Sequence, residues 1–150
     1  LSFMFSSVLF SLRKIGDIDI TVVSSPTFFS IFSGYLSSLI KRTPFILEIR
    51  DLWPAAIVEL GVLKNKFIIA VLETIELFYY RRADKIIVVT RSFKDNLISR
   101  GITAKKIEVI TNGVDIDFFK SKSKNKELLN KYYLEDKFIV EYIGAHSLSQ

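Results

Sequence analysis

The chain has 150 residues, of which 49% are hydrophobic and 25% are charged, a composition typical of one ordinary soluble globular domain. It contains no cysteine and one histidine, which excludes a disulfide framework or a thiolate metal site and leaves little basis for a zinc or iron centre. The formal net charge of +5 suits phosphate-bearing ligands, an anionic membrane surface or nucleic acid, and does not choose among them.

The first residues predict the end of a helix rather than a targeting signal. Residues 1–12 are mostly apolar, and Arg13 and Lys14 follow them. A signal peptide has the opposite order, with basic residues before its apolar stretch, and this run is too short to span a bilayer. We therefore expect the tail of an interior helix whose beginning is missing, in a cytoplasmic protein.

The next stretch predicts a strand and a second helix. Residues 18–23 form a short apolar strand. The helix that follows ends at Lys41 and Arg42, because the helix macrodipole favours cations at a C-terminus. Its apolar face consists of Phe28, Phe32, Tyr35, Leu36 and Leu39.

A second strand and a longer helix come next. Residues 45–49 form the strand, and Glu48 within it needs a partner, since a carboxylate is costly to bury alone. Residues 67–80 form a core-packed helix in which Glu73 and Glu76 mark one solvent-exposed stripe.

The third strand–helix pair and a fourth strand follow. Residues 85–89 form a strand, and Ser92 and Asp95 have capping-box spacing for the helix that begins there. Gly101 ends that helix, because glycine takes the left-handed conformation without a side-chain penalty. Residues 107–110 form the fourth strand.

The last part of the chain predicts a connector and the beginning of a new strand. Asn112–Gly113 is a strong turn pair. Residues 120–126 contain only Lys, Ser and Asn and form a solvated connector, and residues 127–133 form a short helix. Residues 138–143 form a fresh strand that leads into Gly144.

Strands therefore alternate with amphipathic helices along the chain. This order implies parallel pairing through right-handed crossovers, with helices on both faces of one sheet. The predicted fold class is α/β with a doubly wound parallel sheet, a Rossmann-like architecture that is incomplete at both ends.

Polar residues follow each strand at the carboxyl end of the predicted sheet. Ligands of open parallel sheets bind beyond this edge, where helix N-termini and turn backbones converge. Helix capping alone would also explain Ser24, Ser25 and Thr90, since caps favour Ser and Thr. In chain order the candidates are Ser24 and Ser25, Arg50 and Asp51, Thr90 and Arg91, and Thr111, Asn112 and Gly113.

Arg50 and Asp51 carry the strongest functional signal, because a charged pair directly after an apolar strand lies at the rim of the sheet, beside Trp53. Arginine offers planar donors for hydroxyls or phosphates, and aspartate accepts from a sugar hydroxyl. A plain ion pair at the rim is the alternative. The lone His146 also follows a strand, and a polar loop residue explains it equally well.

The absent motifs narrow the function further. The six glycines do not have the spacing of a dinucleotide fingerprint or a phosphate-binding P-loop, which disfavours an NAD enzyme or an ATPase. The sequence has no nucleophile elbow and no metal-binding helix motif, so we expect no metal and no cofactor. Most aromatic residues lie on apolar faces rather than among clustered Arg and Lys, so nucleic-acid binding ranks last.

Five short motifs occur in the order that is found in one enzyme family. Residues 48–54 read Glu-Ile-Arg-Asp-Leu-Trp-Pro, residues 59–63 Glu-Leu-Gly-Val-Leu, residues 80–86 Tyr-Arg-Arg-Ala-Asp-Lys-Ile, residues 110–115 Ile-Thr-Asn-Gly-Val-Asp, and residues 142–146 Tyr-Ile-Gly-Ala-His. With these motifs the chain resembles bacterial group 1 glycosyltransferases, the family 4 retaining enzymes of GT-B fold. Within that family it resembles the branch typified by N-acetyl-fucosamine transferases of surface polysaccharide synthesis.

The resemblance implies two facing Rossmann-like domains with the active site between them. The second domain would hold a nucleotide-sugar donor, expected to be UDP-linked, and the first would receive a glycan or lipid-linked acceptor. Residues 1–119 would be a partial N-terminal acceptor-side domain, residues 120–136 a linker with a short helix, and residues 137–150 the first strand and loop of the nucleotide-sugar-binding domain. Gly144 and His146 would lie in that loop.

The same resemblance implies that parts of the enzyme lie outside this chain. The family's first strand and Gly-rich loop would precede Leu1, and its donor-binding Glu pair would follow Gln150. We therefore expect the chain alone to lack transferase activity. Many relatives carry His where Arg50 stands, so the role of that His does not transfer directly to this position.

Two further expectations concern the class of protein and its location. The alternative to an enzyme is a non-catalytic α/β binding or regulatory module that kept the scaffold. In an enzyme that acts on lipid-linked acceptors, the basic residues Lys41, Arg42, Lys64 and Lys66 would attract the anionic inner face of the plasma membrane. An ordinary solvated face is the alternative for these four residues.

Overall fold

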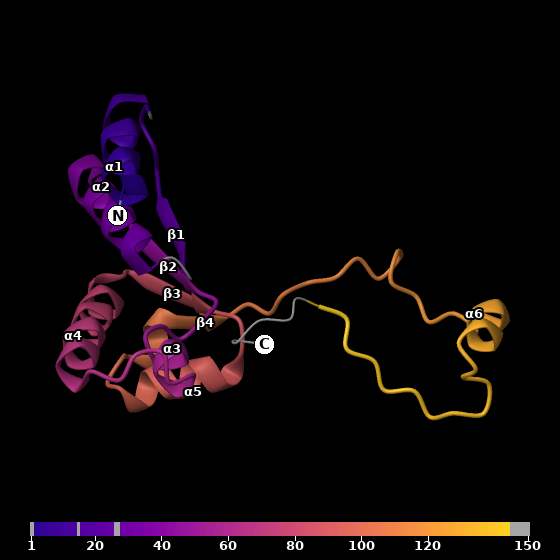
Figure 1. The fold of residues 1–150 in the computed structure, drawn as a ribbon. Helices are drawn as coiled ribbons and strands as arrows, with labels where there is room; N and C mark the ends of the chain where they lie inside the picture. The colour runs from indigo at the N-terminus through magenta and orange to yellow at the C-terminus, as the bar shows by residue number, and fades with distance from the viewer. Residues whose placement is uncertain (1, 15, 26–27, 145–150) are drawn as a thin grey trace. The chain divides into compact units, whose positions relative to one another are not determined.

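The computed structural model describes residues 2–14, 16–25 and 28–144 of the chain (Figure 1). The chain separates into two compact units, Leu1–Asn112 and Gly113–Gln150. The strands that the structure describes all belong to the first unit, and so do its described helices apart from α6 (Lys126–Lys131).

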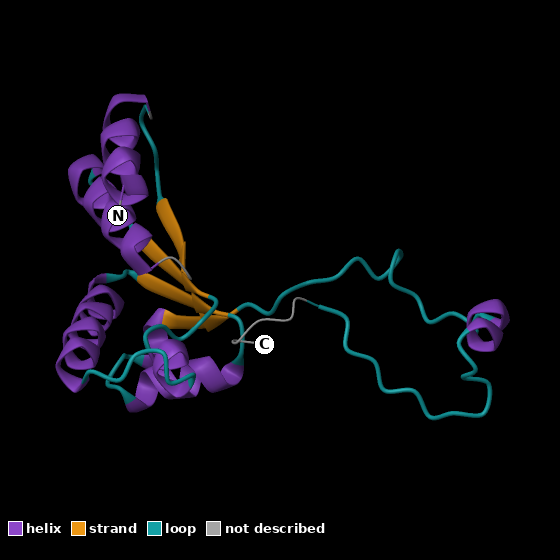
Figure 2. Ribbon diagram, viewed as in Figure 1, coloured by secondary structure: helices purple, strands orange, loops and turns teal. Residues whose placement is uncertain are grey.

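The first unit is built on a four-stranded parallel sheet (Figure 2). Its strands pair in chain order, β1-β2-β3-β4. They are β1 (Thr21–Ser25), β2 (Phe45–Ile49), β3 (Lys85–Val88) and β4 (Ile107–Val109). The predicted fold class, an α/β domain with a Rossmann-like parallel sheet, is confirmed.

The strand boundaries show what sets the ends of a strand. The prediction for β2 is confirmed to the residue, and those for β3 and β4 are one residue too long. The prediction for β1 began three residues too early, at Ile18 rather than Thr21, and ended two residues too early, at Val23 rather than Ser25. Thr21 lies opposite Phe45, the first residue of β2, so the residues before Thr21 have no residue of β2 to pair with.

The helices follow the predicted order, with one addition. A helix over the first residues, the helix after β1, the long helix after β2 and the helix after β3 are all confirmed in kind. A short helix over Ala55–Glu59 was not predicted. The bounds are α1 (Ser2–Lys14), α2 (Phe28–Lys41), α3 (Ala55–Glu59), α4 (Lys66–Arg82) and α5 (Arg91–Ser99), with a 3₁₀ turn over Ala104–Lys106 before β4.

The core lies on one face of the sheet. Leu47, Ile86 and Ile107 are opposite one another on β2, β3 and β4 and are almost completely buried. The three helices that connect successive strands each add to this cluster, with Ile31 from α2, Tyr79 from α4 and Leu97 from α5. On the other face, none of the described strand residues is buried. The prediction of helices on both faces of the sheet is therefore wrong for the described residues, because right-handed crossovers between strands in sequential order place their helices on the same face.

Helix α2 meets the sheet through small residues, which the predicted apolar face did not anticipate. Phe28 is buried as expected, but Phe32 and Leu39 are exposed, and the buried positions include Ser33, Ser37 and Ser38. The approach to β1 is close at Gly34, where a Cβ atom would lie 1.9 Å from Cγ2 of Val23. Helices α1 and α2 lie side by side in Figure 1, and the Ser11 and Ser37 hydroxyls join them at 2.8 Å.

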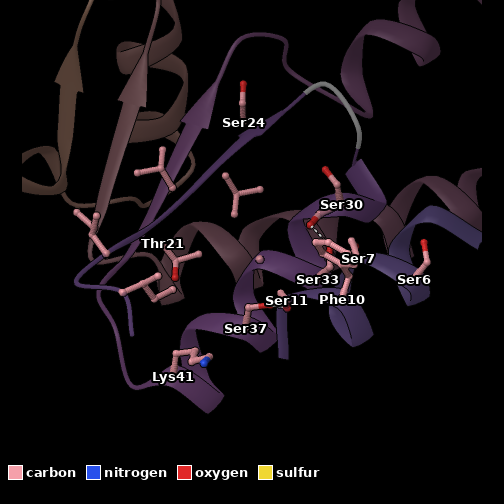
Figure 3. Close-up of a pocket in the computed structure, with 15 residues that line it drawn as sticks. Ser6, Ser7, Phe10, Ser11, Thr21, Ser24, Ser30, Ser33, Ser37 and Lys41 are labelled. Atoms are coloured by element: carbon pink, nitrogen blue, oxygen red, sulfur yellow. Dashed lines mark hydrogen bonds between the residues drawn. The ribbon is translucent and has the colours of Figure 1, made fainter. Parts of the chain in front are cut away.

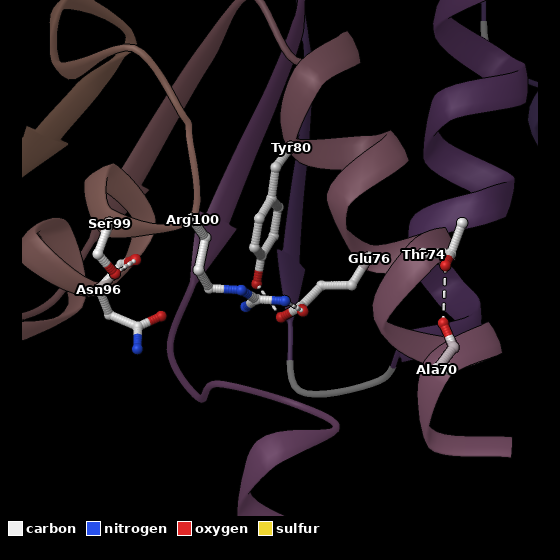
Figure 4. Close-up of polar contacts among 7 residues, drawn as sticks. All are labelled: Ala70, Thr74, Glu76, Tyr80, Asn96, Ser99 and Arg100. Carbon is white, nitrogen blue, oxygen red and sulfur yellow. Dashed lines mark hydrogen bonds and ion pairs between the residues drawn. The ribbon is translucent and has the colours of Figure 1, made fainter. Parts of the chain in front are cut away.

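Helix α4 buries the carboxylate of Glu76, which was expected in a solvent-exposed stripe. Glu76 is 2% exposed, and its Oε1 accepts a 2.5 Å hydrogen bond from the Tyr80 hydroxyl. Its Oε2 forms an ion pair with Arg100, which follows α5. Figure 4 shows the three side chains pointing toward one another. The prediction for Glu76 is therefore wrong, because Arg100 and Tyr80 satisfy both oxygens and allow the charge to be buried.

The protonation states of this cluster, Glu76, Tyr80 and Arg100, favour the same arrangement. Burial, and then the nearby Glu76 carboxylate, raise the pKa of the Tyr80 phenol well above its ordinary value. Burial alone would lower the pKa of Arg100, but the hydrogen bond and the charge of Glu76 raise it instead. Tyr80 therefore keeps its proton for donation, and Arg100 keeps its positive charge, at neutral pH.

The second unit has less regular structure than was predicted. The helix expected at residues 127–133 is confirmed as α6, which Asn125 caps by accepting from the backbone N of Leu128. The strand expected at residues 138–143 is not formed, and Phe138 is 95% exposed. A strand needs a neighbour to pair with, and no described residue pairs with this segment. The turn expected at Asn112–Gly113 is also not formed.

We predict that Arg100→Met lowers the free energy of unfolding by about 3 kcal/mol, because the Glu76 carboxylate then stays buried without its cation. Replacing the whole cluster, with Glu76→Leu and Tyr80→Phe added, should recover most of that loss, since no buried charge or unpaired hydroxyl remains. Urea unfolding followed by circular dichroism measures both values. A loss below about 1 kcal/mol for Arg100→Met, as for an exposed pair, would show that the charge is not buried in solution.

We also predict that Gly34→Ala destabilises the domain. Alanine gains about 1 kcal/mol of helix propensity over glycine, but the overlap with Val23 costs about 1 to 3 kcal/mol and should outweigh it. The loss should shrink in a Val23→Ala background. Gly16→Ala is the matched control, because a Cβ there meets no atom within 4 Å. Equal thermal unfolding midpoints for the Gly34→Ala and Gly16→Ala variants would contradict the close contact.

Candidate functional site

The predicted site residues of the first unit lie along one edge of the sheet. Parallel strands end on the same side, so the carboxyl ends of β1, β2, β3 and β4 meet at that edge. The edge carries Ser24 and Ser25, Arg50 and Asp51, Thr90, and Asn112. The sheet thus brings together residues that are up to 88 positions apart (112 − 24) in the chain.

The link between β1 and β2 involves Ser25 and Asp51. Both Ser24 and Ser25 belong to β1 itself rather than to the loop after it, and Ser25 is buried. The Ser25 hydroxyl donates to the backbone oxygen of Asp51 at 3.4 Å, and the same oxygen accepts from the backbone N of Trp53 at 3.2 Å. Ser25 therefore helps to hold the Arg50–Asp51 turn and is itself removed from solvent.

The side chains of Arg50 and Asp51 are exposed. Neither takes part in an ion pair with any residue that the structure describes. The alternative of a plain ion pair at the rim is therefore not seen. A guanidinium with five donors and a carboxylate with two acceptor oxygens stand at this edge with their hydrogen-bonding capacity available to a ligand.

Three aromatic rings adjoin the Arg50–Asp51 turn. The rings of Phe28 and Trp53 lie 4.4 Å apart between centroids with an interplanar angle of 35°. Phe29 meets Phe28 at 5.5 Å and Trp53 at 6.4 Å, in both cases edge to face. We call Phe28, Phe29 and Trp53 the aromatic platform. The periodicity assigned Phe28 to the core and did not single out Phe29, and only the packing of α2 against the turn brings the three together.

Thr90 serves as a helix cap. Its hydroxyl oxygen accepts from the backbone N of Phe93 at 3.2 Å, which makes Thr90 the N-cap of α5. The capping box expected at Ser92 is therefore wrong, since the helix begins at Arg91. Gly101 ends the helix with a φ of +85°, as predicted.

The remaining candidates are placed as follows. Asn112 is exposed at the end of the first unit, and Gly113 begins the second. Gly144 is exposed within the second unit. His146 lies outside the described residues. The structure therefore brings Ser24, Ser25, Arg50, Asp51, Thr90 and Asn112 of the first unit to one edge of its sheet.

A groove of about 860 Å³ runs between α1, α2 and the outer side of β1 (Figure 3). Its size is that of a ligand site, but its polar groups are already engaged. The Ser7, Ser11 and Ser33 hydroxyls donate to carbonyl oxygens of their own helices. Of the predicted residues only Ser24 lines it. We therefore place the functional site at the carboxyl edge rather than in the groove.

The four basic residues expected at a membrane surface do not form one group. Lys41 and Arg42 end α2 next to the start of β2, at the amino edge of the sheet. Lys66 begins α4, whose other end, Arg82, lies just before β3. The 17 residues of α4 separate its ends by about 24 Å at 1.5 Å per residue. The basic residues at the amino edge are instead Lys41, Arg42, Arg81, Arg82, Lys85, Lys105 and Lys106.

The described residues contain neither a membrane-spanning helix nor a cluster of metal-binding side chains. None of the helices within residues 2–14, 16–25 and 28–144 is long and apolar enough to cross a membrane. The same part of the chain contains no group of three or more His, Cys, Asp or Glu side chains that could hold a metal ion.

Comparison with known proteins identifies a family for most of the chain. The model of the family described as Glycosyltransferase Family 4 matches residues 1–118. This range covers the whole first unit and all six candidates at the carboxyl edge. No curated protein matches the chain.

We predict that Thr90→Ala lowers the free energy of unfolding by about 1 kcal/mol through loss of the cap, whereas Thr90→Ser retains most of the stability. Thermal unfolding measures both effects. If Thr90 acts only as a cap, folded Thr90→Ala protein binds substrates as tightly as the parent. A large loss of substrate affinity at unchanged stability would instead make Thr90 a ligand-binding residue.

Proposed function

The chain belongs to glycosyltransferase family 4, and on that premise we propose that its first unit is the acceptor-side domain of a two-domain, GT-B-type glycosyltransferase. Family membership makes the chain a glycosyl-transferring protein with a sugar donor and an acceptor as its partners. The proposal adds that the donor is a nucleotide-sugar, held by a second domain. The acceptor then meets the carboxyl edge of the first unit.

The observation that carries this proposal is the exposed Arg50–Asp51 turn at that edge. Open parallel sheets bind ligands beyond the carboxyl ends of their strands. In this chain the edge presents a guanidinium and a carboxylate without ion-pair partners among the described residues. The turn is held from below by the buried Ser25. Charged groups on a fixed turn can orient substrate hydroxyls or phosphate oxygens with little loss of conformational freedom on binding.

The roles of the two side chains differ in chemistry. Asp51 accepts hydrogen bonds from acceptor hydroxyls, which orients the attacking oxygen toward the sugar that is transferred. Arg50 donates to phosphate or hydroxyl oxygens with its planar fork, and its charge compensates the negative charge of a departing nucleotide. The motifs around residues 48–54 and 110–115 support a retaining enzyme of surface polysaccharide synthesis.

The location of the enzyme follows from its acceptor. A lipid-linked acceptor is available at the inner face of the plasma membrane, and a basic surface favours that location. Each Lys or Arg near an anionic surface contributes about 1 kcal/mol of attraction. The basic amino edge of the sheet provides such a surface: it keeps Lys41 and Arg42 of the four residues expected from the sequence and adds Arg81 and Arg82.

We predict that Arg50→Lys and Asp51→Asn, made in the complete transferase, each reduce kcat/KM by about tenfold to a hundredfold. Losing one charge-assisted hydrogen bond costs about 1.5 to 3 kcal/mol. Lysine keeps the charge of Arg50 but loses the planar fork, and asparagine keeps the size of Asp51 but loses the charge. Initial rates with a nucleotide-sugar donor and a glycan acceptor measure the effect.

The matched controls are Arg13→Lys and Asp95→Asn, the same two changes at exposed positions away from the turn. Both should keep the parent rate. If the Arg50 and Asp51 variants melt well below the parent yet turn over normally when folded, the pair is structural and the proposed site is wrong. A complete protein that transfers no sugar from any nucleotide-sugar would favour the non-catalytic module.

A further inference from the structure

We propose that the aromatic platform of Phe28, Phe29 and Trp53 binds a pyranose ring of the acceptor by stacking, beside the polar groups of Arg50 and Asp51. The inference rests on the proposed function and deepens it, because it names the part of the acceptor that the first unit recognises. Among the described residues, the ring contacts of Phe29 are those with Phe28 and Trp53, and Phe29 is not part of the buried core cluster.

A binding surface needs a buried base and accessible rings above it, and the three rings differ in burial in this way. Phe28 is 5% exposed and forms the base of the platform, whereas Phe29 is 48% exposed and Trp53 is half-buried. Phe28 lies against one face of the indole at 4.4 Å. Packing against Phe28 therefore holds the indole in place, while part of Trp53 remains accessible.

The position of the platform is fixed by the same turn that holds the charged pair. The backbone N of Trp53 donates to the backbone oxygen of Asp51, two residues earlier, and Ser25 donates to that oxygen as well. From the other side, Phe28 and Phe29 are the first two residues of α2. The rings and the charged pair thus adjoin the same turn, which contacts from β1 and α2 hold in place.

A pyranose fits this combination of groups. The face of an aromatic ring carries partial negative charge, and one face of a pyranose presents several C–H groups with partial positive charge. Around its rim the same sugar offers hydroxyls, which suit a carboxylate acceptor and a guanidinium donor. A lipid chain would use the rings but leave Arg50 and Asp51 without a ligand. The adjacent charges therefore favour a sugar as the occupant.

Trp53 reports on binding directly, because it is the only tryptophan of the chain. We expect the disaccharide of N-acetylglucosamine to change its fluorescence in a saturable way, up to the hundred-millimolar range. Sorbitol, which has similar hydroxyls but no ring face, should cause no saturable change. The Trp53→Phe variant shows how much of the signal comes from this residue. This measurement needs no turnover.

Kinetics of the complete transferase provide the second test. Phe29→Leu and Trp53→Leu should raise the KM for the acceptor by about three- to tenfold, the range typical of one aromatic contact, and leave the KM for the donor unchanged. Trp53→Phe keeps a ring and should restore most of the affinity. Phe67→Leu is the matched control, since Phe67 is 77% exposed on α4 and belongs to no ring pair among the described residues.

The outcomes separate this proposal from the proposed function. Saturable quenching by the disaccharide without any sugar transfer would support the platform and overturn the proposed function. Normal transfer with an unchanged acceptor KM in the Phe29→Leu variant would overturn the platform alone, and this variant matters because Trp53→Leu also removes packing on Phe28. A fluorescence response to anionic phospholipid vesicles but not to the disaccharide would likewise overturn it in favour of a lipid contact.

Discussion

Parallel pairing of the four strands in chain order is the constraint on which the rest of the first unit depends. It turns every connection into a crossover, and the crossover helices come to lie on one face, where Leu47, Ile86 and Ile107 form a buried row. It also places all four carboxyl ends at one edge. Core and candidate site therefore share a single cause, because the pairing of β1 with β2 also brings the Ser25 hydroxyl next to the charged turn that it holds.

The buried cluster of Glu76, Tyr80 and Arg100 fixes how the helices around this apolar core are oriented. A core of aliphatic side chains tolerates small slides of one helix against another, because its contacts are not directional. A carboxylate that needs both a guanidinium and a phenol has few positions in which all partners are satisfied. The cluster therefore sets how α4 lies relative to the end of α5, while the apolar contacts supply most of the stability.

The sequence predicts an element best where the residues of that segment alone determine its structure. The central strand β2 could be predicted to the residue, because a proline before the apolar run and a charged pair after it mark both of its ends. The buried face of α2 could not be predicted in this way, since the close approach at Gly34 puts serines against the sheet and leaves Phe32 exposed. Residues 138–143 have the composition of a strand, but pairing depends on a neighbour and not on the segment itself.

The same distinction applies to the candidate site. Arg50 and Asp51 could be found from the sequence, because their place after a strand fixes them at an edge. The aromatic platform could not be found from the sequence. Phe29 and Trp53 are 24 positions apart (53 − 29), and no pattern in either segment predicts that the two rings are in contact. Their contact comes from the tertiary packing of α2.

The outer side of β1 has a consequence for the behaviour of the protein in concentrated solution. β1 is the end strand of the described sheet, so one side of its backbone has no strand to pair with. Such an edge is a template for aggregation by strand addition. Lys41, which lines the groove beside this strand, places a positive charge near it. Charge is one device that slows edge-to-edge association, so salt that screens the charge should promote self-association.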